Sequence, residues 1–166
     1  MLDLTFERLT PEHDVGRFDC GNDDLNDFLQ SDALGYQDQH LAGTWVVFDS
    51  GLLVAFFSMS ADAIPLDKSE PQPDGCLEKD IRTYPALKVG RLATQADRQG
   101  DGIGTEILRA CIGTAVALRE SHVGCRFVTV DANPDKVDWY LGRGFERNKY
   151  YVSRTKTSSL RYDILV

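Results

Sequence analysis

The stretch that decides the fold is LATQADRQGDGIGT, residues 92–105. It begins at the end of a strand predicted over 86–94 and leads directly into an apolar-periodic helix predicted over 103–120. Three glycines within five residues let the backbone turn tightly and approach a ligand closely. The first N–H groups of a helix lack internal partners and lie at the positive end of its dipole. This stretch therefore predicts a binding site for a phosphate or pyrophosphate.

The residue types in this loop narrow the choice of ligand. A Walker A loop needs Lys directly after its last glycine, but Gly104 is followed by Thr105. A dinucleotide-binding GxGxxG motif that starts at Gly102 needs glycine at position 107, which is Ile107. The pattern that fits is Gln-x-x-Gly-x-Gly, starting at Gln99. A loop that only connects strand and helix is the alternative without a ligand.

The rest of the chain predicts a mixed α/β domain around one sheet. We take the Pro-containing segment 65–85 as a long surface insertion rather than a domain boundary, so that 1–166 forms a single domain. Outside this segment, period-2 and period-3.6 patterns alternate along the chain. Strands are predicted over 2–9, 44–48, 52–59, 86–94, 126–130, 145–152 and 160–165, and helices over 24–36, 103–120 and 134–143.

The overall composition fits a globular protein of the cytoplasm. The 166 residues are 42% hydrophobic and 27% charged, which argues against disorder, and the net charge of −8 argues against a general nucleic-acid binder. The longest apolar run, 51–57, is far shorter than the ~20 residues of a membrane helix. The four cysteines form no CxxC pair and the three histidines are far apart, so we expect free thiols and no metal site.

Several separated motifs, in order, resemble the GCN5-related N-acetyltransferase (GNAT) superfamily. The resemblance covers roughly residues 6 to 166. It includes the glycine loop, the strand before it, a later strand, an aromatic-Tyr pair followed by Gly-Phe, and an N-terminal segment that is similar to a subgroup including acetyltransferase toxins. The corresponding sequences are QGDGIG (99–104), GRLAT (90–94), FVTVDAN (127–133), WYLGRGF (139–145) and FDCGN (18–22).

This resemblance implies a single-domain GNAT-like α/β fold with a central mixed, mostly antiparallel sheet flanked by helices. It also implies an acetyl-CoA-dependent N-acetyltransferase, in which a small-molecule or peptide amine attacks the thioester directly. The resemblance assigns cofactor contacts to a strand, to the glycine loop and to one later residue. These contacts are Leu92, Ala93 and Thr94 for the pantetheine arm, Gln99, Gly100, Asp101, Gly102, Ile103, Gly104 and Thr105 for the pyrophosphate, and Asn133.

By the same resemblance, Tyr140 is the general acid that protonates the departing thiolate, a suitable task for a phenol. The alternative is a tyrosine that only packs beside Trp139. No general base stands out by spacing among the carboxylates. The four candidates are Glu78, Asp80, Glu106 and Asp131.

One residue departs from the family pattern. Asp101 stands where family members commonly have Lys or Arg, and its charge should weaken diphosphate binding unless it points away or Arg98 compensates. We therefore expect Asp101 to tune cofactor affinity rather than to act as a ligand.

Two other functions remain open from the sequence. One is a toxin-type acetyltransferase that acts on aminoacyl-tRNA, which would be the only nucleic-acid partner expected; the other is a non-catalytic CoA-binding module. The expected partners are acetyl-CoA and an amine acceptor, with a homodimer left open and no membrane. A basic segment near the C-terminus is a candidate tRNA surface, or else a solvated pair of strands. Its residues are Arg143, Arg147, Lys149, Arg154, Lys156 and Arg161.

Overall fold

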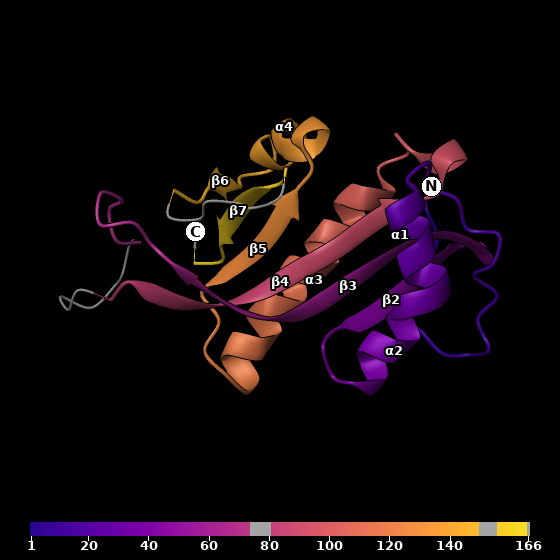
Figure 1. The fold of residues 1–166 in the computed structure, drawn as a ribbon, viewed down its shortest axis with the longest axis horizontal. Coiled ribbons are helices and arrows are strands. Elements are labelled where there is room, and N and C mark those ends of the chain that lie inside the picture. Colours follow the sequence, from indigo (N-terminus) through magenta and orange to yellow (C-terminus); the bar gives the residue numbers. More distant parts are fainter. Residues whose placement is uncertain (74–80, 150–155, 166) are drawn as a thin grey trace. The chain divides into compact units, whose positions relative to one another are not determined.

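The computed structural model describes residues 1–73, 81–149 and 156–165. Its strands form a seven-stranded mixed sheet in the order β1-β2-β3-β4-β5-β7-β6 (Figure 1), which confirms the predicted α/β class. The chain divides into two compact units, Met1–Ser60 with Gly90–Ala110 and Ala61–Val89 with Cys111–Val166. Three elements pass from one unit to the other, and each unit is described by itself. These elements are β3 (Leu52–Pro65), β4 (Thr83–Thr94) and α3 (Ile103–Ser121).

In the first unit, β1 (Leu4–Arg8) and β3 both pair antiparallel with β2 (Gly43–Asp49). The turn between β2 and β3 has positive φ angles at Ser50 (51°) and Gly51 (82°). Two successive residues with positive φ are typical of the tight type I′ hairpin turn. The hairpin predicted from the Asp-Ser-Gly sequence is therefore confirmed.

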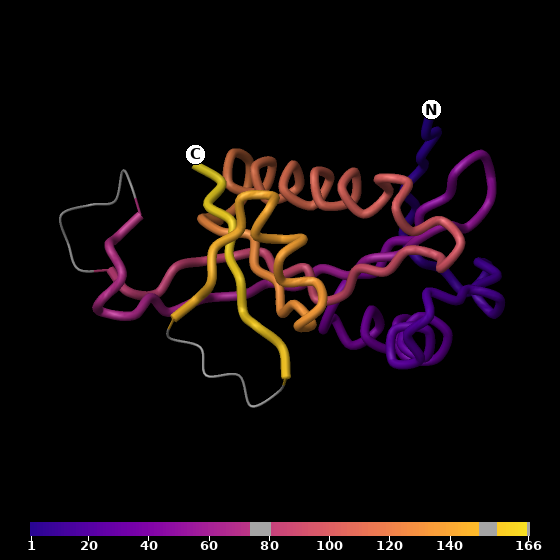
Figure 2. Tube along the Cα trace, turned by 90° about the horizontal axis from the view of Figure 1, so that it is seen from above, coloured from indigo at the N-terminus to yellow at the C-terminus, as the bar shows by residue number. Residues whose placement is uncertain are grey.

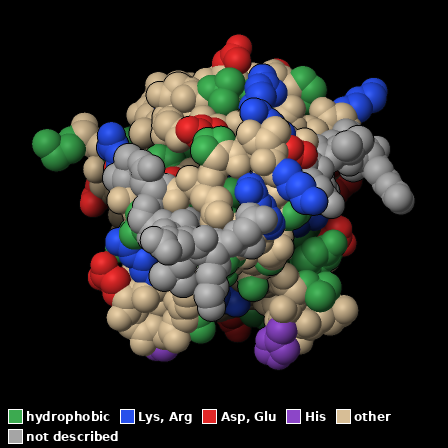
Figure 3. Space-filling view, turned by 90° about the vertical axis from the view of Figure 1, so that its left-hand side faces the viewer, with side chains coloured by type: hydrophobic (Ala, Val, Ile, Leu, Met, Phe, Trp, Pro, Cys, Tyr) green, Lys and Arg blue, Asp and Glu red, His purple; other side chains and the backbone are tan. Residues whose placement is uncertain are grey.

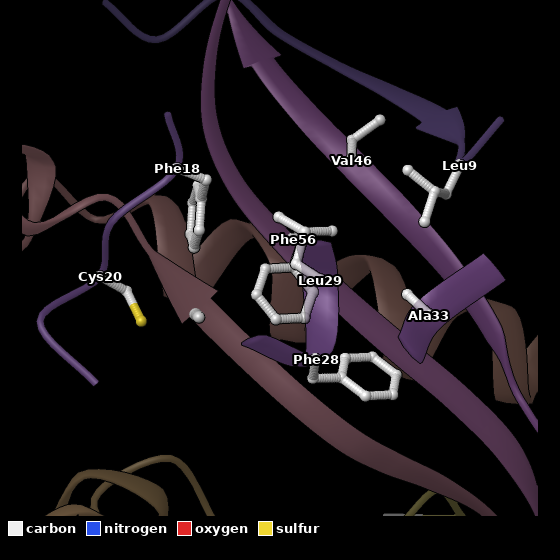
Figure 4. Packing of buried hydrophobic residues seen from close by; sticks show 9 residues of the cluster. Leu9, Phe18, Cys20, Phe28, Leu29, Ala33, Val46 and Phe56 are labelled. Atoms are coloured by element: carbon white, nitrogen blue, oxygen red, sulfur yellow. The ribbon is translucent and has the colours of Figure 1, made fainter. Parts of the chain in front are cut away.

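The helix predicted over 24–36 is present in three pieces, α1 (Asp23–Asp27), a π-helical turn η1 (Phe28–Asp32) and α2 (Ala33–Asp38). Asn22 caps α1, because its side-chain oxygen accepts from the backbone N–H of Leu25 at 3.1 Å. These helices lie on one side of β2 and β3 (Figure 2) and supply part of the apolar core of this unit (Figure 4). The buried members of this core are Leu9, Phe18, Cys20, Phe28, Leu29, Ala33, Val46, Phe56 and Ala93.

In the second unit, β4 pairs in parallel with β5 (Phe127–Ala132), with Ala86 opposite Phe127. Strand β7 (Ser158–Asp163) pairs antiparallel with β5 and with the short β6 (Glu146–Arg147). A 3₁₀ turn, η3 (Pro134–Lys136), leads into α4 (Val137–Leu141). An apolar cluster of this unit is formed by Ile64, Leu66, Tyr84, Ala86 and Phe127.

The residues at both ends of segment 65–85 are packed into the protein, whereas the sequence predicts a surface insertion. Strand β4 starts at Thr83, and the side chains of Leu66 and Tyr84 are buried. Glu70 is also buried and makes an ion pair with Arg161 at 2.6 Å. The prediction was wrong here because proline suggests a loop, although an extended chain accommodates it at strand ends. Residues 74–80 lie outside the described part, as do 150–152 of the strand predicted over 145–152.

The helices and the metal-ligating residue types of the described part of the chain bear on membrane and metal binding. None of the helices in this part of the chain is both long enough and apolar enough to cross a membrane. The same part contains no group of three or more His, Cys, Asp or Glu side chains arranged to hold a metal ion. Cys20, Cys111 and Cys125 are free thiols, and Cys76 lies outside the described residues.

Candidate functional site

The glycine loop belongs entirely to the first unit and joins the end of β4 to the start of α3. The backbone N–H of Gln95 donates to the carbonyl of Val54 at 2.8 Å, and a 3₁₀ turn, η2 (Ala96–Arg98), follows. Gly100 and Gly102 have φ angles of +91° and +89°, a conformation that side chains disfavour. A Cβ built at either glycine meets no atom within 4 Å. Their role is therefore to let the backbone turn rather than to relieve a clash within the protein.

The N–H groups at the start of α3 make this loop a candidate anion site. Thr105 and Glu106 both donate their backbone N–H to the carbonyl of Gly102, at 3.0 and 3.2 Å. Within the described residues, no acceptor lies against the N–H groups of Ile103 and Gly104. Two free donors at the positive end of a 19-residue helix are suited to hold phosphate oxygens.

The charged side chains beside the loop neutralise one another. Arg98 donates from Nε to Asp101 at 2.8 Å and from an Nη to Asp49 at 2.7 Å. Hydrogen bonding to Asp101 and Asp49 raises the pKa of Arg98, and the bond from Arg98 lowers the pKa of Asp49. The compensation of Asp101 by Arg98 that the sequence left open is therefore present as an ion pair.

The side chain of Gln99 is committed within the protein. Its Nε2 donates to the carbonyls of Cys20 at 2.9 Å and Thr94 at 3.2 Å. A contribution of Gln99 to pyrophosphate binding would therefore come from its backbone. The sequence did not reveal the contact with Cys20, because the two residues are 79 positions apart and carry no shared local signal.

The strand residues before the loop are partly accessible. On β4, the side chains of Leu92 and Thr94 are half-buried, and that of Ala93 is buried in the core of the first unit. The guanidinium of Arg91 lies 3.6 Å from the ring centroid of Phe28, which holds this side chain against the helices. The predicted cofactor contacts from Leu92 to Thr105 are thus contiguous in one unit.

An open groove of about 720 Å³ lies elsewhere in the first unit, between β1 and α3. None of its lining residues belongs to the glycine loop, so this groove is not part of the candidate site. The lining residues are Leu2, Leu4, Phe6, Glu106, Arg109 and Ala110.

Tyr140 belongs to the second unit and lies on α4. Its ring makes edge-on contacts with Trp139 at 4.8 Å and Phe145 at 5.3 Å between centroids. No described residue hydrogen-bonds to its hydroxyl group. Burial, with a smaller contribution from the nearby Cys111, raises the pKa of Tyr140 to about 12. The ring of Tyr140 therefore packs beside Trp139, as in the alternative interpretation of a purely structural tyrosine. It also retains a neutral O–H that can donate a proton.

Asn133 also lies in the second unit, exposed at the residue before η3. Its carbonyl accepts from the N–H of Lys136 at 2.9 Å, and its side chain caps no backbone group. Two of the four candidate bases have cationic partners, Arg109 for Glu106 and Lys88 for Asp131. The other two candidates, in 78–80, lie outside the described residues.

The basic residues near the C-terminus have different environments. Arg161 is buried and pairs with Glu70 and Glu146, so its inclusion in an exposed patch was wrong. Arg147, Lys149 and Lys156 are exposed, and the half-buried Arg143 lies over the ring of Trp139. Arg154 lies outside the described residues.

Comparison with known proteins places these features in context. No family model matches the chain. It is similar to a tRNA-acetylating toxin of Mycobacterium tuberculosis, 27% identical over 141 residues that cover 84% of this chain and 82% of the relative. The solved structure of AtaT complexed with acetyl-methionyl-tRNAfMet matches it with a TM-score of 0.80 at 21% identity, over 97% of this chain and 95% of that chain.

A mutant of the AtaT toxin, bound to acetyl-CoA and the C-terminus of the antitoxin AtaR, gives a TM-score of 0.76 at 21% identity. This match covers 98% of this chain and 94% of that chain. The resemblance predicted from the glycine loop and its neighbouring motifs is thereby confirmed: the chain has the GNAT fold and resembles the toxin subgroup of that superfamily.

Proposed function

We propose that this chain is an acetyl-CoA-dependent N-acetyltransferase of the toxin type that acetylates the amine of an aminoacyl-tRNA. The observation that carries the proposal is the glycine loop, because the N–H groups of Ile103 and Gly104 at the start of α3 have no acceptor among the described residues and suit a pyrophosphate. The proposal reverses the order of acceptors expected from the sequence, where a small-molecule or peptide amine came first. The reason is that the relatives are described as a tRNA-acetylating toxin and as a toxin complexed with acetyl-methionyl-tRNA.

The cofactor would bind along the end of β4 and the loop. Backbone groups of 92–94 would pair with the pantetheine arm, as an added strand would. Backbone N–H groups of 99–105 would hold the pyrophosphate, and Asn133 would add a polar contact. This arrangement draws its affinity from fixed backbone dipoles, so it does not require a cationic side chain in the loop.

The reaction needs few protein groups. The amine nitrogen attacks the thioester carbon and forms a tetrahedral intermediate, which then collapses with cleavage of the carbon–sulfur bond. Tyr140 would donate its phenolic proton to the departing thiolate, while the new ammonium group loses its extra proton to solvent. Two observations support this role: no described residue hydrogen-bonds to the hydroxyl of Tyr140, and with a pKa of about 12 this hydroxyl is protonated near neutral pH.

A polyanionic acceptor requires local positive charge in a chain whose net charge is −8. The exposed side chains of Arg147, Lys149 and Lys156 meet this requirement in the second unit. Figure 3 shows Lys and Arg side chains close together near the centre of the face that it presents. Such a surface would bind the tRNA backbone, while the chemistry takes place only at its aminoacyl end.

The test is a thiol-release assay with acetyl-CoA across several acceptors. These are aminoacyl-tRNA, the same tRNA without its amino acid, a peptide amine and a polyamine. We expect thiol release and an acetylated aminoacyl product, detected by mass spectrometry, with the aminoacyl-tRNA alone. A higher kcat/KM for the peptide or the polyamine would restore the small-amine interpretation, and binding of acetyl-CoA without turnover on any acceptor would favour the non-catalytic module.

An antitoxin is a further expected partner, because the similar AtaT is bound to the antitoxin AtaR. If a small repressor is encoded beside this chain, it is the candidate. Co-expression should yield a stable complex with suppressed acetyl transfer, and failure of the two proteins to copurify would count against it.

A further inference from the structure

The N-terminal segment FDCGN (18–22) has no role in the reaction proposed above. Like the glycine loop, it is one of the motifs that resemble the GNAT superfamily. In the structure, its backbone contacts the residues between β4 and the first glycine of the loop. The carbonyl of Asp19 accepts from the N–H of Ala96 at 2.9 Å, and the N–H of Asp19 donates to Oε1 of Gln95 at 3.1 Å. Gln99 donates to the carbonyl of Cys20 at 2.9 Å. Three hydrogen bonds thus join segments 76 to 79 positions apart.

We call residues 18–26 the brace, and the side chain of Asn26 holds its shape. Its Nδ2 donates to Oδ1 of Asp19 at 2.9 Å, and its Oδ1 accepts from the N–H of Cys20, also at 2.9 Å. Oδ1 of Asp19 accepts a second bond from the N–H of Gly21 at 2.8 Å. The bonds from Gly21 and Asn26 lower the pKa of Asp19, which shows that the turn favours the ionised carboxylate.

The brace is fixed to the core of the first unit at its start. Phe18 is 3% exposed and meets the ring of Phe56 edge-on at 5.4 Å (Figure 4). Its carbonyl accepts from the side chain of Gln30 at 3.0 Å. Cys20 belongs to the same buried cluster as Ala93 of β4. The brace is therefore anchored in the core of the first unit, and the first half of the loop is hydrogen-bonded to it.

We propose that the brace is a positioning element for acetyl-CoA binding and that Asn26 is its positioning residue. The inference rests on the proposed function, because it requires acetyl-CoA at the glycine loop. The free N–H groups of Ile103 and Gly104 bind phosphate oxygens well only when they are held in place before the ligand arrives. The contacts at Gln95, Ala96 and Gln99 fix the entry of this loop, and Asn26 fixes the brace that makes them.

The test compares Asn26→Ala with Asp27→Ala. Asp27 is the next residue on α1, is exposed, and makes no side-chain hydrogen bond or ion pair within the described residues, so it is a matched control. For Asn26→Ala we expect the Kd of acetyl-CoA, measured by calorimetry, to rise roughly five- to fiftyfold as pre-organisation is lost. Turnover at saturating acetyl-CoA should stay within about twofold, so the effect falls on KM and not on kcat. Asp27→Ala should change neither quantity.

Several results would overturn the role of the brace. One is a wild-type Kd in a folded Asn26→Ala variant, and another is a loss of kcat with unchanged KM. Hydrogen exchange of the wild-type chain tests the same coupling without a variant. By linkage, acetyl-CoA should slow exchange in 19–26 together with 100–105, and protection confined to 100–105 would refute the coupling. Absence of any acetyl-CoA binding by the wild-type chain would instead overturn the proposed function, and the brace with it.

Discussion

Replacing Tyr140 by phenylalanine tests the chemical step directly, because it removes one oxygen and leaves the ring in place. The contacts with Trp139 and Phe145 involve only the ring, and the hydroxyl has no hydrogen-bond partner among the described residues. The free energy of unfolding should therefore change by less than about 1 kcal/mol, the value of one typical hydrogen bond.

If the phenol protonates the thiolate, turnover should fall roughly ten- to a thousandfold, somewhat less than the roughly 10²–10⁴-fold that one general acid contributes, because water remains as a weaker proton donor. This corresponds to about 1.4–4.1 kcal/mol in the activation barrier. Water can partly replace the phenol, so residual activity is expected. The assay is thiol release at saturating acetyl-CoA, with the Kd measured separately by calorimetry so that binding and turnover are not confused.

The pH profile of the wild-type chain gives a second readout. The protonated phenol is the active form, and with a pKa of about 12 only about 1% of it ionises by pH 10. Deprotonation of Tyr140 should therefore cause no fall in kcat between about pH 7 and pH 10. Turnover of Tyr140→Phe close to that of the wild type would remove Tyr140 from the mechanism and leave the proximity of amine and thioester as the main source of rate.

Three further predictions concern the loop and the second unit. Gly102→Val should abolish most CoA binding in calorimetry while unfolding remains cooperative, because the added Cβ meets no protein atom within 4 Å and the side chain would occupy space at the proposed anion site. Unchanged affinity would place the site elsewhere. Asp101→Lys should tighten CoA binding, and the gain should shrink between about 0.1 M and 1 M salt as the Debye length falls from about 10 to about 3 Å; weaker binding would reveal an unforeseen contact of Asp101. Glu70→Gln should lower the free energy of unfolding in urea by about 3–5 kcal/mol, because it leaves the buried Arg161 without its main partner. The same change at the exposed Glu146 should cost less than about 1 kcal/mol, and equal effects at both sites would refute that account.

The features that could be predicted from the sequence are those encoded locally. The loop at 99–104 is recognisable because glycine spacing and the onset of helical periodicity occur side by side. The hairpin around Ser50 is recognisable because few residue pairs accept positive φ. The π-helical turn at Phe28–Asp32 has no such signal, since its residues have ordinary helical spacing.

Long-range polar contacts could not be predicted for the same reason. Glu70 lies in a Pro-containing, charged segment of a kind usually exposed to solvent, and the sequence predicts the same exposure for Arg161 among its basic neighbours. Both residues are buried because they form an ion pair across 91 positions, and the residues next to each of them in the sequence give no sign of this pair. The brace is a similar case, because it contributes only backbone atoms to its three hydrogen bonds with the loop, and backbone atoms leave no mark on the residue types of the brace.

The charged side chains around the glycine loop cancel one another, so an acidic chain needs another source of attraction to bind a diphosphate. Arg98 is the nearest obvious cation in the loop, but its guanidinium already pairs with Asp49 and Asp101. Its net contribution to the local field is therefore small, and the attraction must come from the N–H groups and the dipole of α3. Such donors act over short distances and only when they are correctly oriented, so affinity depends on the rigidity of the loop more than on long-range charge. This is the physical reason to expect that a support far away in the sequence, the brace, determines how well the loop binds its ligand.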